Sequence, residues 1–93
     1  AAPIGTPIKL TLDGTVSYTG YSSVYGNYVI VTHSGGYQSM YGHMHTIKVK
    51  RGQILSQGSI IGTVGSTGRS TGPHVHFSVY KNGKLINPLT VLK

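Results

Sequence analysis

The sequence of 93 residues predicts a single all-β domain built from antiparallel sheets. Fourteen glycines and seven tyrosines, together with many Val, Ile and Thr residues, favour short strands joined by tight turns. No stretch of useful length carries apolar residues at helical spacing. The length suits one hydrophobic core but not two, so we expect one domain over residues 1–93.

The expected strands are short apolar runs bounded by turn residues. In chain order they are residues 8–12, 15–19, 28–32, 37–42, 46–50, 54–55, 59–64, 74–80 and 85–86. Asp13-Gly14 is a strong hairpin signal between the first two, which gives the only acidic residue a turn role. The nearly continuous apolar run at 28–32 is typical of a central strand. His33-Ser34-Gly35-Gly36 then turns the chain into its partner strand.

Glycine-containing turns also separate the strands of the second half. Arg51-Gly52 and Gln57-Gly58 are expected to turn the chain before the strands at 54–55 and 59–64. The glycine-rich loop Gly65–Pro73 leads into the strand that begins at His74. Asn82-Gly83 carries the type I′ turn signal, which predicts a hairpin at the end of the domain.

Composition restricts the classes of function that the chain can have. It contains no cysteine, which excludes disulfides and thiolate metal ligands. Eight Lys and Arg residues against one acid give a net charge of +7, which favours a polyanionic partner. The basic residues are scattered along the chain, so a generally basic surface without such a partner is an equally good interpretation. The basic residues do not interleave with aromatic residues as they do in proteins that bind single-stranded nucleic acid. No apolar segment is long enough to span a membrane. We expect neither a nucleic-acid partner nor a membrane span.

Four of the five histidines lie in two His-X-His units, His43-Met44-His45 and His74-Val75-His76. Because side chains alternate along a strand, each pair is expected on one face with the middle residue packed beneath it, and Tyr41 on the face of His43 and His45. Two imidazoles at i and i+2 could supply half of a tetrahedral zinc site. The alternative is that they are polar surface residues. Two such pairs in so short a chain favour a site.

A hydrolytic zinc site combines about three protein ligands with an open position for water. The metal lowers the pKa of this water and polarises the scissile carbonyl. Histidines that are not ligands can orient the water, stabilise the oxyanion or protonate the leaving amine. The two pairs could therefore divide ligand and catalytic roles. His33 stands alone at a strand end, where a structural role is the preferred interpretation.

The chain resembles the lysostaphin/LytM-type zinc endopeptidases in a series of blocks that occur in the same order. The matching blocks are residues 28–33, 39–44, 47–54, 58–68 and 70–77, and more weakly 87–88. They cover nearly the whole chain, and His-X-His after a glycine-rich loop is the most specific of them. The resemblance implies two antiparallel sheets that form a narrow groove, of the duplicated-hybrid-motif type. It also implies cleavage of amide bonds in the peptides of bacterial peptidoglycan.

The resemblance assigns roles to individual residues by motif position. It implies that His76 is a Zn²⁺ ligand and that His43 and His74 are catalytic residues that do not bind the metal. Loop 65–73 would form one wall of the substrate groove. The implied groove residues are Tyr41, Gly68, Ser70, Thr71 and Gly72. His45 lies outside the expected family positions, and a surface role is preferred for it.

The sequence departs from the family pattern at its start. Two further ligands, a His and an Asp, are expected just before the segment that resembles Ala1–Pro7. We interpret residues 1–93 as an N-terminally incomplete peptidase domain of a longer protein. The alternatives are an inactive module that binds cell wall or a protein partner, and a site completed by a separate chain. A lipoyl- or biotinyl-like carrier, suggested by the glycine rhythm of residues 49–62, is disfavoured because no lysine has the required context.

The expected function is therefore that of a zinc-dependent, wall-lytic endopeptidase. Its expected partners are peptidoglycan peptide as substrate and the anionic polymers of the wall. The implied substrate, rather than any signal in the sequence, predicts a location outside the cell or in the cell wall, or in the tail of a phage virion.

Overall fold

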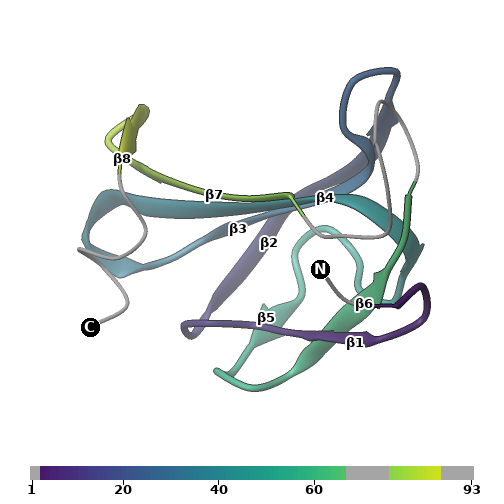
Figure 1. Ribbon diagram of the computed structural model, residues 1–93. Helices are drawn as coiled ribbons and strands as arrows, with labels where there is room; N and C mark the ends of the chain where they lie inside the picture. Colours follow the sequence, from purple (N-terminus) through teal and green to yellow (C-terminus); the bar gives the residue numbers. More distant parts are fainter. Residues whose placement is uncertain (1–2, 67–75, 87–93) are drawn as a thin grey trace.

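The computed structural model describes residues 3–66 and 76–86, which form strands and one short 3-10 helix (Figure 1). In chain order the elements are β1 (Pro7–Lys9), β2 (Gly14–Ser22), β3 (Gly26–Thr32), η1 (Ser34–Gly36), β4 (Tyr37–Ile47), β5 (Ile54–Leu55), β6 (Ile60–Val64), β7 (His76–Lys81) and β8 (Lys84–Ile86). The all-β prediction is confirmed. Across the described residues we find no helix long and apolar enough to cross a membrane.

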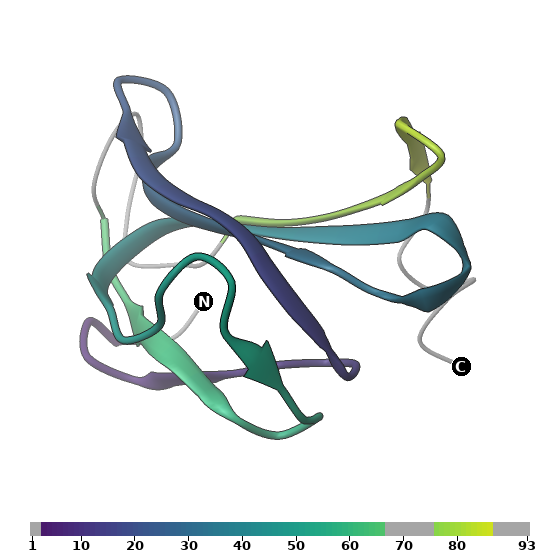
Figure 2. The ribbon, with the colours of Figure 1, turned by 180° about the vertical axis from the view of Figure 1, so that it is seen from behind.

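The sheet branches at β4. The strand order is β1-β6-β4-β3-β2-β5, with β7 added to β4 and β8 to β7, and every pairing is antiparallel. One edge of β4 pairs with β3, whereas the other pairs with β7 over Tyr37–Gly42 and with β6 over Met44–Ile47. Figures 1 and 2 show the two lobes that diverge from this strand. The two expected sheets therefore share β4 and form one curled, hydrogen-bonded sheet.

The hydrophobic core lies where the lobe that contains β1, β5 and β6 packs against β2, β3 and β4. Alternate residues of β3 point into it, because Val29 and Val31 are fully buried while Tyr28 and Ile30 are only partly buried. The core cluster consists of Ile8, Leu10, Val16, Val29, Val31, Tyr41, Met44, Val49, Leu55, Ile61 and Val64. Burial of these side chains is what holds the two lobes together.

The predicted hairpin at Asp13-Gly14 is wrong. β1 pairs with β6, and β2 pairs with β3 and β5, so the chain changes partners at this corner instead of folding back on itself. Asp13 joins separate segments: its Oδ1 accepts a hydrogen bond from the backbone N–H of Gln57 at 2.6 Å. Its carbonyl oxygen lies 2.8 Å from Nδ1 of His33.

Two further strand predictions had different outcomes. The separate strand expected at 46–50 is wrong, because β4 continues from Tyr37 to Ile47 and ends there. The type I′ hairpin at Asn82-Gly83 is confirmed, since both residues have the positive φ values, 49° and 82°, that this turn requires.

Candidate active site

His43 lies at a β-bulge in the middle of β4. Tyr41 pairs with Val29 and Met44 pairs with Asn27, so β4 holds one residue more than β3 across this interval. His43 takes a φ of 57°, in the left-handed region that residues other than glycine rarely adopt. Its side chain is buried at 6% exposure. Strained, buried residues of this kind concentrate at functional sites.

Residues 25–27, at the start of β3, hold the bulge in place. The carbonyl oxygen of Tyr25 accepts a hydrogen bond from the backbone N–H of His43 at 2.5 Å. The side-chain amide of Asn27 donates to the carbonyl oxygen of Met44 at 3.0 Å. The ring of Tyr25 lies against that of His43, with 6.5 Å between centroids. The sequence did not identify these residues as part of the site. The glycine of Tyr25-Gly26-Asn27, which takes a φ of 63°, was the one sign of a tight turn at this position.

The bulge overturns the predicted alternation around His43. Tyr41 and Met44 both belong to the core cluster, although they are three residues apart. His45 is exposed, while His43 is buried, so the two histidines do not share one environment. Tyr41, predicted to line the groove, is only 2% exposed, and its hydroxyl lies 2.9 Å from Oγ1 of Thr11. Its side chain therefore packs in the core.

The second His-X-His unit reaches the bulge through β7. The backbone of His76 pairs with that of Gly42, the residue immediately before His43. This is also where the partner of β4 changes from β7 to β6. The sheet therefore brings the backbone of His76 next to that of Gly42 at its branch point. Other predicted site residues lie outside the described residues, namely His74, Gly68, Ser70, Thr71 and Gly72.

The described residues do not by themselves make up a metal site. An imidazole at position 76 is a chemically suitable zinc ligand. Within residues 3–66 and 76–86, however, no three His, Cys, Asp or Glu side chains gather as a cation site would require. The described residues therefore fit a zinc ion only together with ligands from elsewhere.

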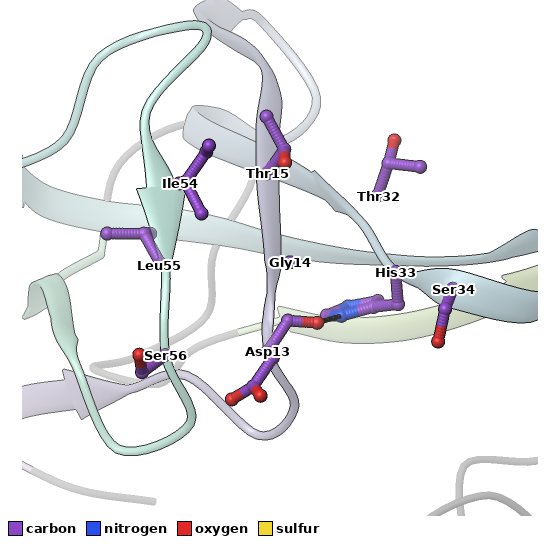
Figure 3. Close-up of a pocket in the computed structure, with 9 residues that line it drawn as sticks. All are labelled: Asp13, Gly14, Thr15, Thr32, His33, Ser34, Ile54, Leu55 and Ser56. Atoms are coloured by element: carbon purple, nitrogen blue, oxygen red, sulfur yellow. Dashed lines mark hydrogen bonds between the residues drawn. The ribbon is translucent and has the colours of Figure 1, made fainter.

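His33 has the structural role that the sequence predicted. Its Nδ1–H donates to the carbonyl oxygen of Asp13, and its Nε2 lies 2.8 Å from the hydroxyl of Ser39. Both ring nitrogens therefore have hydrogen-bond partners within the fold, and the residue is only 7% exposed. Figure 3 shows this ring at the wall of a pocket of about 500 Å³, beside Gly14 and at the corner before β2. This pocket lies away from the bulge, and we assign it no ligand.

One tyrosine pair lies on the face of the sheet opposite the core. The rings of Tyr18 and Tyr28 stack with 5.8 Å between centroids. Burial, followed by the charge and the hydrogen bond of Tyr18, raises the pKa of Tyr28 above its usual 10.0. This face of the sheet therefore carries a pair of stacked aromatic rings.

The curled antiparallel sheet, in which β7 begins at His76 beside the strand that carries His43, is the fold of the lysostaphin-type peptidases. The catalytic domain of lysostaphin from Staphylococcus simulans superposes with a TM-score of 0.90 at 34% identity, covering 98% of this chain and 73% of that one. The chain belongs to peptidase family M23, whose model matches residues 1–88. The resemblance stated from sequence is confirmed.

Two other relatives extend the comparison. Peptidoglycan DD-endopeptidase ShyC of Vibrio cholerae is 47% identical over 90 residues, which cover 97% of this chain and 21% of ShyC. A zinc-containing peptidase from the same species has a TM-score of 0.89 at 40% identity, covering 92% of this chain and 26% of that one. The chain thus spans about a fifth of the length of the curated relatives that it matches.

Proposed function

We propose that this chain carries the catalytic histidines of a zinc-dependent endopeptidase that cleaves peptide bonds in bacterial peptidoglycan. The observation that supports the proposal is the pairing of His76 with Gly42, because it sets the backbone of His76 beside the residue that precedes the strained, buried His43. Family membership and a relative named as a peptidoglycan DD-endopeptidase support the same conclusion. Action outside the cytoplasm, at the cell wall or from a phage tail, follows from that substrate.

The proposed roles divide the histidines into one ligand and two catalytic groups. His76 would hold zinc, which when bound activates water and polarises the carbonyl. His43 would donate a hydrogen bond to the oxygen that becomes negatively charged, or take a proton from the attacking water. The bulge suits this task because backbone contacts with residues 25–27 fix the position of the ring. His74 would be the second catalytic histidine.

Two variants test these roles in the full-length gene product. We expect His76→Ala to lose both bound zinc and the release of new amino termini from purified wall. His43→Ala should keep about one zinc per chain and lose activity by about 10²-fold or more, because it removes a proton-transfer or oxyanion group. His45→Ala, at the exposed neighbour, is the matched control and should keep both. Undiminished hydrolysis by His76→Ala would contradict the proposal.

The same experiment separates the enzyme from an inactive binding module. Wall retention that persists in a chelator, with no hydrolysis by the unmodified protein, would favour the module. Zinc content measured on residues 1–93 alone shows whether this segment completes the metal site. About one zinc per chain, lost in His76→Ala, would mean that it does.

A further inference from the structure

The side chain of Asn27 contacts the part of β4 that follows His43. Its Nδ2 donates a hydrogen bond to the carbonyl oxygen of Met44 at 3.0 Å and lies 3.4 Å from the carbonyl oxygen of His45. A side-chain amide carries two N–H donors, so one asparagine can serve both oxygens. Asn27 is also the residue of β3 that pairs with Met44 at the end of the bulge. The amide therefore holds the backbone directly after the left-handed residue.

His43 needs support from its neighbours because its backbone is strained. A φ of 57° is unfavourable for a residue with a Cβ and persists only where the surrounding structure holds it. On the N-terminal side, the backbone N–H of His43 donates to the carbonyl oxygen of Tyr25. On the C-terminal side, the amide of Asn27 holds the carbonyl group of Met44. Because the direction of a side chain follows its backbone, these two contacts together orient the imidazole.

The place of Asn27 in the sheet favours a role in the site over a purely structural one. β3 and β4 pair residue by residue from Val29 to Thr32, and this ladder joins the two strands through their backbones. The register shifts between Asn27 and Val29, opposite the segment of β4 that contains His43. The side-chain amide therefore acts where the ladder is irregular.

The chemistry of the contact requires a neutral donor at position 27. An aspartate has almost the same shape, but its ionised carboxylate has no proton to donate and would face two carbonyl oxygens. An alanine would remove this donor from the Met44 carbonyl. Either change allows the backbone after His43 to relax and the ring to move. A displacement of about 1 Å can lower the rate of an enzyme by about 10²-fold.

We propose that Asn27 is a positioning residue of the endopeptidase, whose amide keeps the His43 imidazole in its catalytic orientation without contacting the substrate. The proposal rests on the proposed function and adds to it the residue on which His43 depends. It has a specific consequence: the effect of Asn27 on hydrolysis passes through His43.

The test measures kcat and KM of the full-length gene product on a soluble cross-linked peptide fragment of peptidoglycan. We expect Asn27→Asp and Asn27→Ala to lower kcat by about 10-fold or more, with KM changed by less than about twofold and bound zinc retained. In a His43→Ala background the same substitutions should change kcat by less than about twofold, because the ring that they displace is absent. Asn82→Asp makes the same chemical change in the exposed turn after β7 and is the matched control, with kcat expected within about twofold of the unmodified protein.

Kinetics are measured below the melting temperature of each variant, so that a loss of stability is not counted as a loss of kcat. The positioning role is wrong if both Asn27 variants keep their kcat, or if they lose as much in the His43→Ala background as in the unmodified protein. Loss of bound zinc would also overturn it, since Asn27 would then act on the metal site. Full activity of His43→Ala, or no hydrolysis by the unmodified protein, would instead contradict the proposed function, and the role of Asn27 with it.

Discussion

At the scale of single residues, His33 shows how a histidine outside the active site stabilises this fold. Its ring connects the corner before β2 with β4, through Asp13 and Ser39. The hydroxyl of Ser39 is almost fully buried, at 2% exposure of the residue, so water could not easily replace the imidazole. Through Ser39 the ring therefore supports the strand that carries His43.

We predict that His33→Ala lowers the free energy of unfolding by about 2–4 kcal/mol. The variant loses two hydrogen bonds, leaves a buried serine hydroxyl without this partner and opens a cavity. Urea unfolding followed by circular dichroism measures the change. His45→Ala removes an exposed imidazole and should cost less than about 0.5 kcal/mol. A loss below about 1 kcal/mol in His33→Ala would show that the hydrogen bonds of His33 to Asp13 and Ser39 contribute little to stability.

The raised pKa of Tyr28 predicts a loss of stability in alkali. Burial is the main cause, and Tyr18 adds to it. Below pH about 10 the phenol is protonated in both the folded and the unfolded chain, so its contribution is fully present. As the pH rises above that value the unfolded chain releases this proton first, and the free energy of unfolding falls until the pH passes the raised pKa.

Urea unfolding between pH about 9 and about 11 measures this slope. Tyr28→Phe should make it shallower because the variant has no proton to release at this position. Tyr18→Phe should have a smaller effect in the same direction, since it removes only the secondary causes of the shift. An identical slope in Tyr28→Phe and in the unmodified protein would contradict the prediction.

At the scale of elements, the sequence predicts a local turn better than it predicts which strands pair with each other. Asn82-Gly83 dictates its own turn, because both residues accept positive φ. Asp13-Gly14 carries a similar signal, but the hydrogen bonds of β6 and of β3 and β5 fix the neighbouring strands elsewhere. Such long-range partners cannot be read from a dipeptide.

The candidate site shows the same limit at His43. The sequence can single out His43 and His76 as candidates, since the His-X-His spacing is local. It does not indicate the bulge, because the extra residue is held by contacts with residues 25–27, far from His43 in the chain. The bulge in turn moves Tyr41 into the core, where strand alternation had not placed it.

Gly62 in β6 and Gly65 just after it allow this segment to approach β4 next to the bulge. A Cβ on Gly62 would collide with the carbonyl oxygen of Thr46 and with the side chain of Met44. A Cβ on Gly65 would collide with the backbone of His45. The close approach therefore needs glycine at both positions, and it fixes the part of β4 next to His43.

We predict that Gly62→Ala destabilises the fold by about 1–3 kcal/mol, the usual cost of overpacking. Urea unfolding gives the value. Gly20→Ala is the matched control: its Cβ would approach only the rings of Tyr18 and Tyr28, at 3.3 Å, and these side chains can shift. Equal effects of the two variants would show that the close contact with β4 is not the cause.

At the scale of the whole molecule, the net charge of +7 has little internal compensation. The only acidic residue, Asp13, accepts a hydrogen bond from the backbone of Gln57. Lys9 and Lys48 lie on either side of β6, since one pairs with Ile60 and the other donates its backbone N–H to Ile61. Exposed basic side chains therefore lie on both sides of β6.

We propose that this charge holds the protein on the anionic polymers of the wall, and we predict that retention on purified wall depends on salt. Raising the salt from about 0.1 M to about 1 M shortens the Debye length from about 10 Å to about 3 Å, which screens exposed charges. A combined Lys48→Gln, Lys50→Gln and Arg51→Gln variant should elute at lower salt than the unmodified protein, because all three side chains are exposed. Walls stripped of their anionic polymers should bind both proteins equally and more weakly. Retention that is unchanged across this range of salt would show that contacts with the peptide, rather than charge, hold the protein on the wall.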